Sequence, residues 1–313
     1  AVLRSVLNNK STIVFLGDAK ANKKSRARWV SKVVNMPYLA DLPRPITAGT
    51  KETFEWIQNS EIFSKNFRQE KDSIIEIIKN SDGSFNLKDS QNNSYTSRYV
   101  ILATGIMDVQ PAIQGSIRPV LPYANNGHID YCMRCDGHNA IGKITAAIGH
   151  NMTAAKVAII LHERYNPPAM KIFTNGQELN CDDESKSLID LYRIKVIKSP
   201  IVSIKGDPKT KMEAFELEDG TIEPVEMAFP MLGQIAYNEL ALQLGATVTE
   251  KGNVVCNEKG ESSIPGFYVA GDLRDTGKYQ IYTAWDQAVD SADDIDMKIR
   301  LQKRQQLLVN SLN

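Results

Sequence analysis

The chain has 313 residues, with 37 lysines and arginines against 37 aspartates and glutamates, and 42% of its residues are hydrophobic. A formal net charge of zero provides no general attraction to nucleic acid or to an anionic membrane, so we expect neither as a partner. At roughly 150 residues per domain, the length predicts about two domains, each large enough for its own core.

The first half of the chain predicts short helices and strands. Apolar spacing predicts a helix over 1–9 and a buried strand over 11–16, whereas the basic segment 20–32 and the prolines after it predict a loop. The next expected elements are a helix at 50–67, a small β-meander at 73–78, 84–87 and 94–96, and a strand at 99–105 that ends in small residues.

The second half of the chain predicts the start of a second β-α-β unit and, at its end, a long helix. A buried strand at 143–149 leads into a helix at 153–164 and a strand at 170–173. The later elements are strands at 195–204, 214–217, 226–231 and 266–272 and helices at 238–244 and 281–301. This alternation predicts an α/β protein with two nucleotide-binding halves.

Neither a membrane span nor a secretory signal is expected. The most apolar predicted helical stretch, 144–161, contains His150, Asn151 and Lys156 and falls short of the ~20 apolar residues that cross a bilayer. The first residues show neither a basic lead nor an apolar signal region, and four cysteines do not make a secreted disulfide scaffold. We therefore expect a cytoplasmic protein.

Cys132 and Cys135 are separated by two residues, a spacing typical of redox or metal chemistry in a cytosolic chain. A zinc site would need a second pair of ligands, but Cys181 and Cys256 stand alone and His138 has no suitably spaced histidine partner. The motif therefore favours a redox-active thiol pair. Two such thiols at the start of a helix or turn can close a small disulfide ring with little rearrangement.

Three segments together resemble the low-molecular-weight thioredoxin reductase family: ATG at 103–105, YCMRCDG at 131–137, and VAGD at 269–272 followed by QIYTA at 280–284. The middle segment is specific, because a thiol pair followed directly by Asp-Gly is rare outside this family. The resemblance covers most of the chain. It implies an α/β fold of two Rossmann-like, three-layer nucleotide-binding domains.

The resemblance also implies how these domains are built. Residues 1–120 and 230–313 are expected to form one discontinuous FAD-binding domain. The central insertion, 121–229, is expected to be a degenerate NADPH-type domain that carries the thiol pair. The family further implies a homodimer.

The resemblance gives each redox residue a role. Cys135 is expected to face the flavin and exchange electrons with it, and Cys132 to attack the disulfide of a thioredoxin-like or other dithiol protein. Asp136 is expected to serve as acid or base for the departing thiol. These roles suit exchange chemistry, since thiolate attack gives a mixed disulfide and the departing sulfur needs a proton.

The other expected site residues contact FAD. By resemblance, Asp272 directs its carboxylate to the ribitol or pyrophosphate, and the helix after it points its positive end at the flavin. Tyr279 stands where the family usually has arginine. Asp18 is either a ligand of the adenosine ribose or a plain turn residue. The full expected set is Asp18, Ala103, Thr104, Gly105, Gly271, Asp272, Tyr279, Gln280, Ile281 and Trp285.

The chain departs from the family at both glycine-rich loops, whose backbone N–H groups receive pyrophosphate. We expect the first loop upstream of Ala1, with a natural domain start at Ala1 as the alternative. In the second loop, GHNMTA at 149–154, Asn151 replaces the glycine that lets the pyrophosphate approach. No arginine pair follows the strand at 170–173 to hold a 2′-phosphate, so we expect no NADPH binding.

Members without pyridine-nucleotide sites occur in cyanobacteria, and the sequence looks most like these. They include a diflavin-linked disulfide oxidoreductase, with a second FAD near the first, and a ferredoxin-linked thioredoxin reductase. Trp285, Tyr279 and His138 are planar residues that can flank stacked rings. We expect one FAD, or two in the diflavin kind. The alternatives are a ferredoxin-dependent or NADPH-dependent thioredoxin reductase and, from another class, a non-catalytic flavoprotein sensor or binding module.

The basic run between 20 and 32 has two interpretations. It is a solvated loop, or it binds phosphate or docks an acidic partner such as ferredoxin with an attraction that weakens in salt. Its basic residues are Lys20, Lys23, Lys24, Arg26, Arg28 and Lys32, with Trp29 among them.

Overall fold

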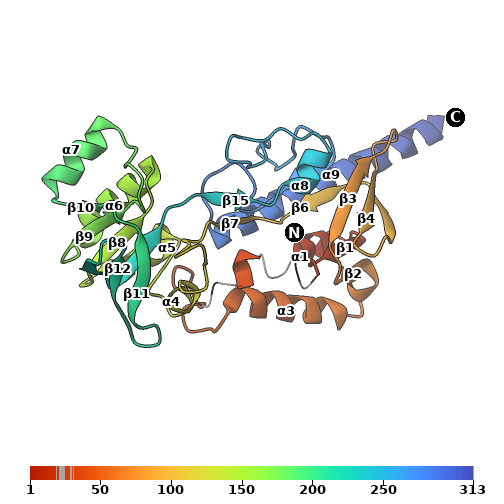
Figure 1. Cartoon of the computed structure of the whole chain (residues 1–313). Helices are drawn as coiled ribbons and strands as arrows, with labels where there is room; N and C mark the ends of the chain where they lie inside the picture. The colour runs from red at the N-terminus through yellow and green to blue at the C-terminus, as the bar shows by residue number, and fades with distance from the viewer. Residues whose placement is uncertain (19, 21–24, 29, 31, 313) are drawn as a thin grey trace. The chain divides into compact units, whose positions relative to one another are not determined.

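The computed structural model describes residues 1–312 apart from 19, 21–24, 29 and 31. The chain divides into two compact units (Figure 1). Unit 1 contains both chain ends and comprises Ala1–Lys32, Leu42–Met107 and Ile235–Asn313. Unit 2 comprises Val33–Asp41 and Asp108–Gln234.

The central unit is longer than the insertion expected at 121–229, since the chain enters it at Asp108 and leaves it at Gln234. The reason lies in packing. Ile113 and Val120 are buried in one hydrophobic cluster with Ile129, inside unit 2. The stretch before 121 has no helical or strand periodicity, so its sequence does not indicate which core it joins.

Unit 1 consists of small sheets covered by helices. Its helices are α1 (Val2–Leu7), α3 (Pro45–Gln58), α8 (Glu239–Gln243) and α9 (Ile281–Leu312), with 3-10 turns η1 (Arg26–Arg28) and η2 (Ser64–Asn66). Its strands are β1 (Thr12–Phe15), β2 (Phe67–Glu70), β3 (Ile74–Lys79), β4 (Phe85–Asp89), β5 (Ser94–Ser97), β6 (Val100–Leu102) and β16 (Phe267–Val269). β7 (Ile106–Asp108) and β15 (Gln234–Ala236) pair where the chain passes between the units.

Parallel pairing dominates where the expected flavin segments lie. β1 pairs with β2 and β16 with β6, both in parallel. β3, β4 and β5 form the expected antiparallel meander. The β6–β16 pair contributes Leu102, Phe267 and Val269 to the main core of the unit. A smaller cluster of Val6, Phe54 and Ile57 holds α1 against α3.

The helix expected at 50–67 is displaced toward the N-terminus. α3 starts at Pro45, whose fixed φ suits the first turn of a helix, and it ends at Gln58. The remainder of the expected helix forms η2 and the start of β2 instead. Phe67 explains this difference, because it packs on Phe54 as the first residue of a strand rather than as the last turn of a helix.

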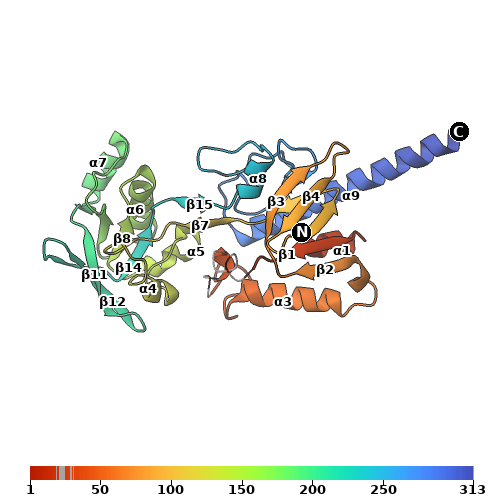
Figure 2. The same ribbon diagram turned by 45° about the vertical axis from the view of Figure 1, so that its right-hand side comes forward.

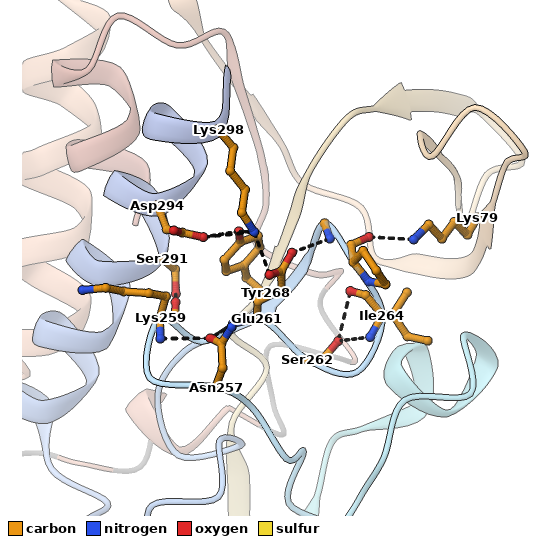
Figure 3. A network of polar contacts seen from close by, with 12 residues as sticks. Lys79, Asn257, Lys259, Glu261, Ser262, Ile264, Tyr268, Ser291, Asp294 and Lys298 are labelled. Atoms are coloured by element: carbon orange, nitrogen blue, oxygen red, sulfur yellow. Dashed lines mark hydrogen bonds and ion pairs between the residues drawn. The ribbon is translucent and has the colours of Figure 1, made fainter. Parts of the chain in front are cut away.

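The long helix α9 is fixed to unit 1 by a buried polar network (Figure 3). The hydroxyl of the fully buried Tyr268 donates to an Asp294 carboxylate oxygen at 2.5 Å. The Lys298 ammonium donates to Tyr268 at 2.7 Å and to Glu261 at 2.6 Å. α9 extends beyond the expected end at 301, and its last turns are exposed and project from the rest of the unit in both Figure 1 and Figure 2.

Unit 2 is built in layers around a parallel sheet. Its helices are α4 (Leu121–Asn125), α5 (Met133–Asp136), α6 (Met152–Tyr165) and α7 (Asp183–Leu191), with the 3-10 turn η3 (Gly137–Ala140). Its strands are β8 (Thr145–Ile148), β9 (Met170–Phe173), β10 (Lys195–Ile197), β11 (Ile201–Asp207), β12 (Lys211–Leu217), β13 (Ile222–Pro224) and β14 (Met227–Pro230). The parallel sheet has the order β10-β9-β8-β14, and β11, β12 and β13 form an antiparallel sheet.

The alternation of side chains along β8 separates the two cores. Ala146 and Ile148 face a cluster shared with Phe215 of β12, whereas Ala147 faces a cluster shared with Leu161 of α6. Helices therefore cover one face of the parallel sheet and the antiparallel strands cover the other, which can be followed in Figure 2. This is the three-layer arrangement that the family resemblance implies for a nucleotide-binding unit.

Two local differences have clear causes. The strand expected at 195–204 is divided into β10 and β11, because Pro200 lacks the N–H that a continuous ladder requires. α7 was not expected. Its N-cap is Asp182, which accepts from the Ser185 N–H at 2.8 Å, followed by acidic residues in the first turn. Across the described part of the chain, no helix is both long and apolar enough to cross a membrane.

Candidate functional site

The thiol pair lies at the start of a short helix in unit 2, as its spacing predicts. Cys132 and Cys135 form a disulfide with a Cα–Cα distance of 5.2 Å, and α5 begins directly after Cys132. The Cys132 Sγ accepts a hydrogen bond from the Cys135 backbone N–H at 3.1 Å. The same N–H also donates to the Cys132 carbonyl at 3.0 Å, so the sulfur is a second acceptor for it at the N-cap of the helix.

Gly137, directly after Asp136, allows the redox turn to pack closely on α6. A Cβ at this position would lie 2.9 Å from the Tyr165 ring carbon Cε2 and 3.4 Å from Leu161 Cδ2. Any larger residue would force the Tyr165 side chain or the turn itself to move. The Asp-Gly sequence that follows the thiol pair thus has a packing reason of its own.

Asp136 is a partly buried carboxyl group next to the disulfide. Burial, together with the negative charge of Asp130, raises its pKa to about 7. A carboxyl group with such a pKa can both donate and accept a proton near neutral pH. The sequence predicts Asp136 as acid or base only through the family resemblance, whereas its surroundings give that expectation a physical basis.

Tyr131, directly before Cys132, has a polar partner that the sequence does not predict. The Tyr131 hydroxyl donates a hydrogen bond to the side-chain oxygen of Gln110. Burial and the negative charges of Asp108 and Asp130 raise the Tyr131 pKa, so the hydroxyl keeps its proton. A tyrosine within the motif is the only sequence signal that could have indicated this contact.

The loop after β8 is closed by a side chain. The Asn151 Oδ1 accepts from the Ala154 N–H at 3.1 Å, which caps α6, and its Nδ2 donates to the Met231 carbonyl at 2.9 Å. A Cβ at Gly149 would lie 2.8 Å from that same carbonyl. Asn151 thus occupies the helix end where a glycine-rich loop would leave room for pyrophosphate.

The segment after β9 carries no cationic group to hold a 2′-phosphate. It continues as Thr174, Asn175, Gly176, Gln177 and Glu178. The Thr174 hydroxyl donates to the Gln177 carbonyl at 2.6 Å, and the Asn175 side chain accepts from the Ile201 N–H at 2.9 Å. These side chains therefore satisfy the local backbone.

In unit 1, the structure brings together two of the segments expected to contact FAD. β6 and β16 pair in parallel, and the Ala270 N–H donates to the Leu102 carbonyl at 3.0 Å. Because both strands end at the same edge, the residues after them are neighbours. These residues are Ala103, Thr104 and Gly105 after β6 and Gly271 and Asp272 after β16.

The glycines at this edge leave open space. A Cβ at Gly105 would meet no atom within 4 Å, and one at Gly271 would meet only Ala284 Cβ, at 3.7 Å. Both glycines have positive φ angles, of 70° and 82°, which other residues rarely adopt. The Gly271 N–H donates to the Gln287 side chain of α9 at 2.8 Å, and the Thr104 hydroxyl donates to the Tyr237 carbonyl at 2.6 Å.

Asp272 has an ion-pair partner that sequence analysis did not identify. Arg26, on η1, places its Nη1 2.9 Å from Asp272 Oδ2. Arg26 therefore contacts the expected flavin site, so this residue of the basic run is not purely a solvated side chain. Lys20 and Lys32 are exposed. Lys23, Lys24 and Trp29 lie outside the described residues.

The start of α9 holds the remaining expected residues. Gln280 is buried, its side chain donates to the Tyr279 carbonyl at 3.0 Å, and Ile281 is the first residue of the helix. Tyr279 has a left-handed backbone (φ 47°), and Trp285 is 57% exposed. All belong to unit 1, whereas His138 belongs to unit 2 and is exposed.

Asp18 follows β1, and its backbone N–H donates to the Ser73 hydroxyl at 2.9 Å. This contact fits the turn interpretation and leaves the role of its carboxylate a prediction. Cys181 is a free, buried thiol. Cys256 is also free, and burial raises its pKa to about 11. Among the described residues, no group of three or more His, Cys, Asp or Glu side chains could hold a metal ion.

The chain is similar to curated proteins over part of their length. It is 26% identical to a component of alkyl hydroperoxide reductase from Xanthomonas campestris pv. phaseoli over 65% of this chain and 38% of that protein. It is 26% identical to a thioredoxin reductase of Listeria innocua over 62% of this chain and 60% of that protein. The aligned region is thus less than two thirds of each of these relatives.

Solved structures share the fold. A putative thioredoxin reductase, TrxB, from Bacillus anthracis superimposes with a TM-score of 0.78 at 20% identity, covering 96% of this chain and 95% of that one. Thioredoxin reductase from Streptococcus pyogenes MGAS5005 gives 0.80 at 18% identity, covering 95% and 94%. These likenesses confirm the expected two-domain, Rossmann-like α/β fold.

The sequence profile of one family, pyridine nucleotide-disulphide oxidoreductase, matches residues 17–292. The match includes the disulfide pair, Asp136 and the edge formed by β6 and β16. Since it spans most of the sequence, the chain belongs to the pyridine nucleotide-disulphide oxidoreductase family.

Proposed function

We propose that the protein is an FAD-dependent disulfide oxidoreductase of the thioredoxin-reductase-like kind, which exchanges electrons between FAD and the Cys132–Cys135 pair. One observation carries the proposal. The disulfide begins a short helix and is followed directly by Asp136, whose pKa burial and the Asp130 charge raise to about 7. A disulfide beside a group that can supply a proton is what thiol–disulfide exchange requires.

The exchange step uses the reduced pair. The Cys132 thiolate attacks the disulfide of the partner, so that one S–S bond breaks while a mixed disulfide forms, and Asp136 gives its proton to the departing partner sulfur. The Cys135 thiol then attacks the mixed disulfide and restores the Cys132–Cys135 bond. The proton that Cys135 loses passes to the second partner sulfur, so the partner leaves as a dithiol. Two electrons have passed from the cysteine pair to the partner. The Cys135 N–H, which contacts the Cys132 sulfur at 3.1 Å, favours a thiolate there.

The edge formed by β6 and β16 fits a flavin nucleotide. Gly105 and Gly271 leave room for a ligand to approach the backbone, and α9 begins beside this edge. Asp272 can accept from ribitol hydroxyls, and Arg26 beside it offers a cation to phosphate. When bound, FAD supplies the two-electron chemistry that renews the dithiol state.

The loop after β8 and the segment after β9 do not favour NADPH as the electron donor. Asn151 accepts from the Ala154 N–H with its own side chain and donates to the Met231 carbonyl, so it occupies the helix end that would receive pyrophosphate. The segment after β9 contains no arginine, and the Lys198 ammonium beside it is paired with the Glu178 carboxylate at 2.5 Å, so no arginine of the segment itself holds a 2′-phosphate. The residues present do not fit NADPH, which supports the NADPH-independent kind of enzyme.

The proposal also concerns the number of flavins per chain and the electron donor. The resemblance to the cyanobacterial diflavin enzymes and the exposed ring of Trp285 support a second FAD near the first. A ferredoxin-linked reductase is the alternative, for which the basic residues around Arg26 are the candidate docking surface. The proposed partner is a thioredoxin-like or other dithiol protein, and the proposed form is a cytoplasmic homodimer.

Trapping experiments test the proposed exchange. In the Cys135→Ser variant, Cys132 attacks the partner but no second thiol resolves the mixed disulfide, so a thioredoxin-like protein should stay attached until a reductant is added. The matched Cys132→Ser variant should trap none. Equal trapping by both variants, or by neither, would contradict the assigned roles. Loss of flavin from both variants would mean that the substitutions disturb the fold instead.

The amount of FAD released per chain distinguishes one bound flavin from two. FAD liberated by denaturation is measured per chain, with protein concentration taken from amino-acid analysis. Two FAD per chain supports the diflavin kind, whereas one FAD excludes it. A protein that holds FAD but whose flavin spectrum responds to no dithiol or disulfide would be a flavoprotein module without this activity.

A further inference from the structure

Two exposed arginines lie beside the redox disulfide. Arg134 stands between the two cysteines on α5, so the chain itself keeps it within one helical turn of both. Arg164 belongs to the last turn of α6, and its Nη1 lies 3.7 Å from the sulfur of Met133, the residue directly after Cys132. Positive charge therefore reaches the disulfide from two elements of unit 2.

The place of Arg164 is fixed by the packing of α6 on the redox turn. A Cβ at Gly137 would lie 2.9 Å from the Tyr165 ring and 3.4 Å from Leu161 Cδ2, so these two residues of α6 contact the turn closely. Leu161 is three residues before Arg164 and shares a helix face with it. The arginine thus lies at the edge of a close contact and keeps its place next to the disulfide.

Few carboxylates offset these positive charges. Between residues 109 and 162 the sequence contains only two acidic residues, Asp130 and Asp136, and both are partly buried. Burial and the charge of Asp130 raise the pKa of Asp136 to about 7, so Asp136 is not fully charged near neutral pH. Glu163 accepts from the Tyr192 hydroxyl at 2.9 Å and so faces α7. The exposed charges next to the disulfide are therefore mainly positive.

We propose that Arg134 and Arg164 form a cationic docking surface, which selects a disulfide partner that carries acidic residues beside its own disulfide. The choice of partner rests on the proposed function, whereas the positive potential at Cys132 stands independently. A partner disulfide must reach bonding distance of Cys132, so charges that flank it come close to these guanidinium groups. Arginine pairs well with carboxylates, and complementary charges raise the encounter rate in a way that salt weakens. The two arginines determine specificity and take part in no bond change.

Alkylation of the flavin-loaded protein, reduced anaerobically and then freed of reductant, measures this potential without any partner. Iodoacetate and iodoacetamide are nearly equal in size and differ by one negative charge. Each forms an S–C bond and releases iodide, and mass spectrometry gives the rate at Cys132. At low salt, the ratio of the iodoacetate rate to the iodoacetamide rate should exceed the ratio for 2-mercaptoethanol. It should approach that reference at ~0.5 M salt, where surface charges are screened.

The variants assign the potential to the two side chains. Arg134→Gln and Arg164→Gln should each lower the ratio about two- to threefold, the effect of one charge at ~7 Å across water. Arg164→Lys keeps the charge and should keep the ratio. Lys186→Gln is the matched control, because it removes an exposed charge from α7 beside Ser185, which contacts Met152 at the opposite end of α6. It should leave the ratio unchanged.

Two results would overturn the inference. One, which needs no variant to fold, is a wild-type ratio that is no higher than that of 2-mercaptoethanol or that ignores salt. The other is a ratio that both arginine-to-glutamine variants leave unchanged, or that Lys186→Gln lowers equally.

Exchange with two small disulfides of opposite charge provides the functional readout. The anionic probe is 3,3′-dithiodipropionate and the cationic probe is cystamine, and each is compared between wild type and variants so that its intrinsic reactivity cancels. Loss of either arginine should slow exchange with the anion and speed exchange with the cation, whereas the opposite order would contradict the proposed selection. If the wild type reduces neither probe while the alkylation ratios behave as described, the proposed function fails and the cationic surface stands.

Discussion

Replacing Asp136 with asparagine should change how the stability of the protein depends on pH. Burial and the charge of Asp130 raise the folded-state pKa of Asp136 from 3.8 to about 7. A raised pKa means that the folded state binds the proton more tightly than the unfolded state does. The stabilisation is therefore fully present below pH 3.8 and is lost as the pH rises through about 7.

The size of the effect follows from these two values. At 1.36 kcal/mol per pH unit, the interval from 3.8 to about 7 gives an upper bound of about 4 kcal/mol. Asp136 is only partly buried, and solvent screening reduces the loss to about 2 kcal/mol. The asparagine variant carries no titrating group at this position. It should therefore match the wild type near pH 4 and exceed its free energy of unfolding by about 2 kcal/mol at pH 8.

Urea unfolding of the oxidised protein at both pH values, followed by circular dichroism, measures this difference. Asp190→Asn is the matched control, because Asp190 is an exposed acid of unit 2 on α7. It should follow the wild type at both pH values. The reasoning is refuted if Asp136→Asn loses as much stability between pH 4 and pH 8 as the wild type does.

Three further predictions concern packing and cofactor contacts. Asn151→Ala removes a helix cap and a second hydrogen bond, so urea unfolding should show a loss of about 1–3 kcal/mol, and an unchanged midpoint would mean that the cap is unimportant. Gly137→Ala places a Cβ 2.9 Å from the Tyr165 ring and should cost about 1–3 kcal/mol, with much of that cost absent in a Tyr165→Leu background. Arg26→Ala removes the cation that lies beside Asp272 and is proposed to meet the FAD phosphate, so it should raise the FAD dissociation constant of the apoprotein, measured by flavin fluorescence, whereas exposed Lys32→Ala should not.

Periodicity and turn chemistry predict much of the fold. The strands around the redox unit are recognisable because they are short apolar runs bounded by Gly, Pro or Asn, and 170–173 coincides with β9. α7 is hard to recognise because its exposed face is densely polar, and of its apolar residues only Leu188 and Ile189 pack inward. Its acidic start and the Asp182 cap are visible in the sequence and would have indicated a helix.

The candidate site could be predicted only where the residues are neighbours in the sequence. Cys132, Cys135 and Asp136 form one contiguous motif, so their proximity needs no tertiary information. The Arg26–Asp272 pair joins residues 246 positions apart, and no local pattern relates them.

The effect of Asn151 is predictable from the sequence only in part. The missing glycine is visible in the sequence, where it suggests a crowded pyrophosphate loop. The structure shows a different physical cause. The Asn151 side chain takes over two contacts, to the Ala154 N–H and to the Met231 carbonyl, so the loop is stabilised in a closed form rather than merely crowded.

Anaerobic reduction of the flavin-loaded protein tests the central claim most directly. Flavin absorbance is followed while NADPH or a dithiol is added in stoichiometric steps, with Cys132→Ser and Cys135→Ser measured alongside. The account predicts that the dithiol bleaches the wild-type flavin, that NADPH leaves its spectrum unchanged, and that dithiol bleaching is lost in both variants. Bleaching by NADPH, or dithiol bleaching that persists without the Cys132–Cys135 pair, would contradict it.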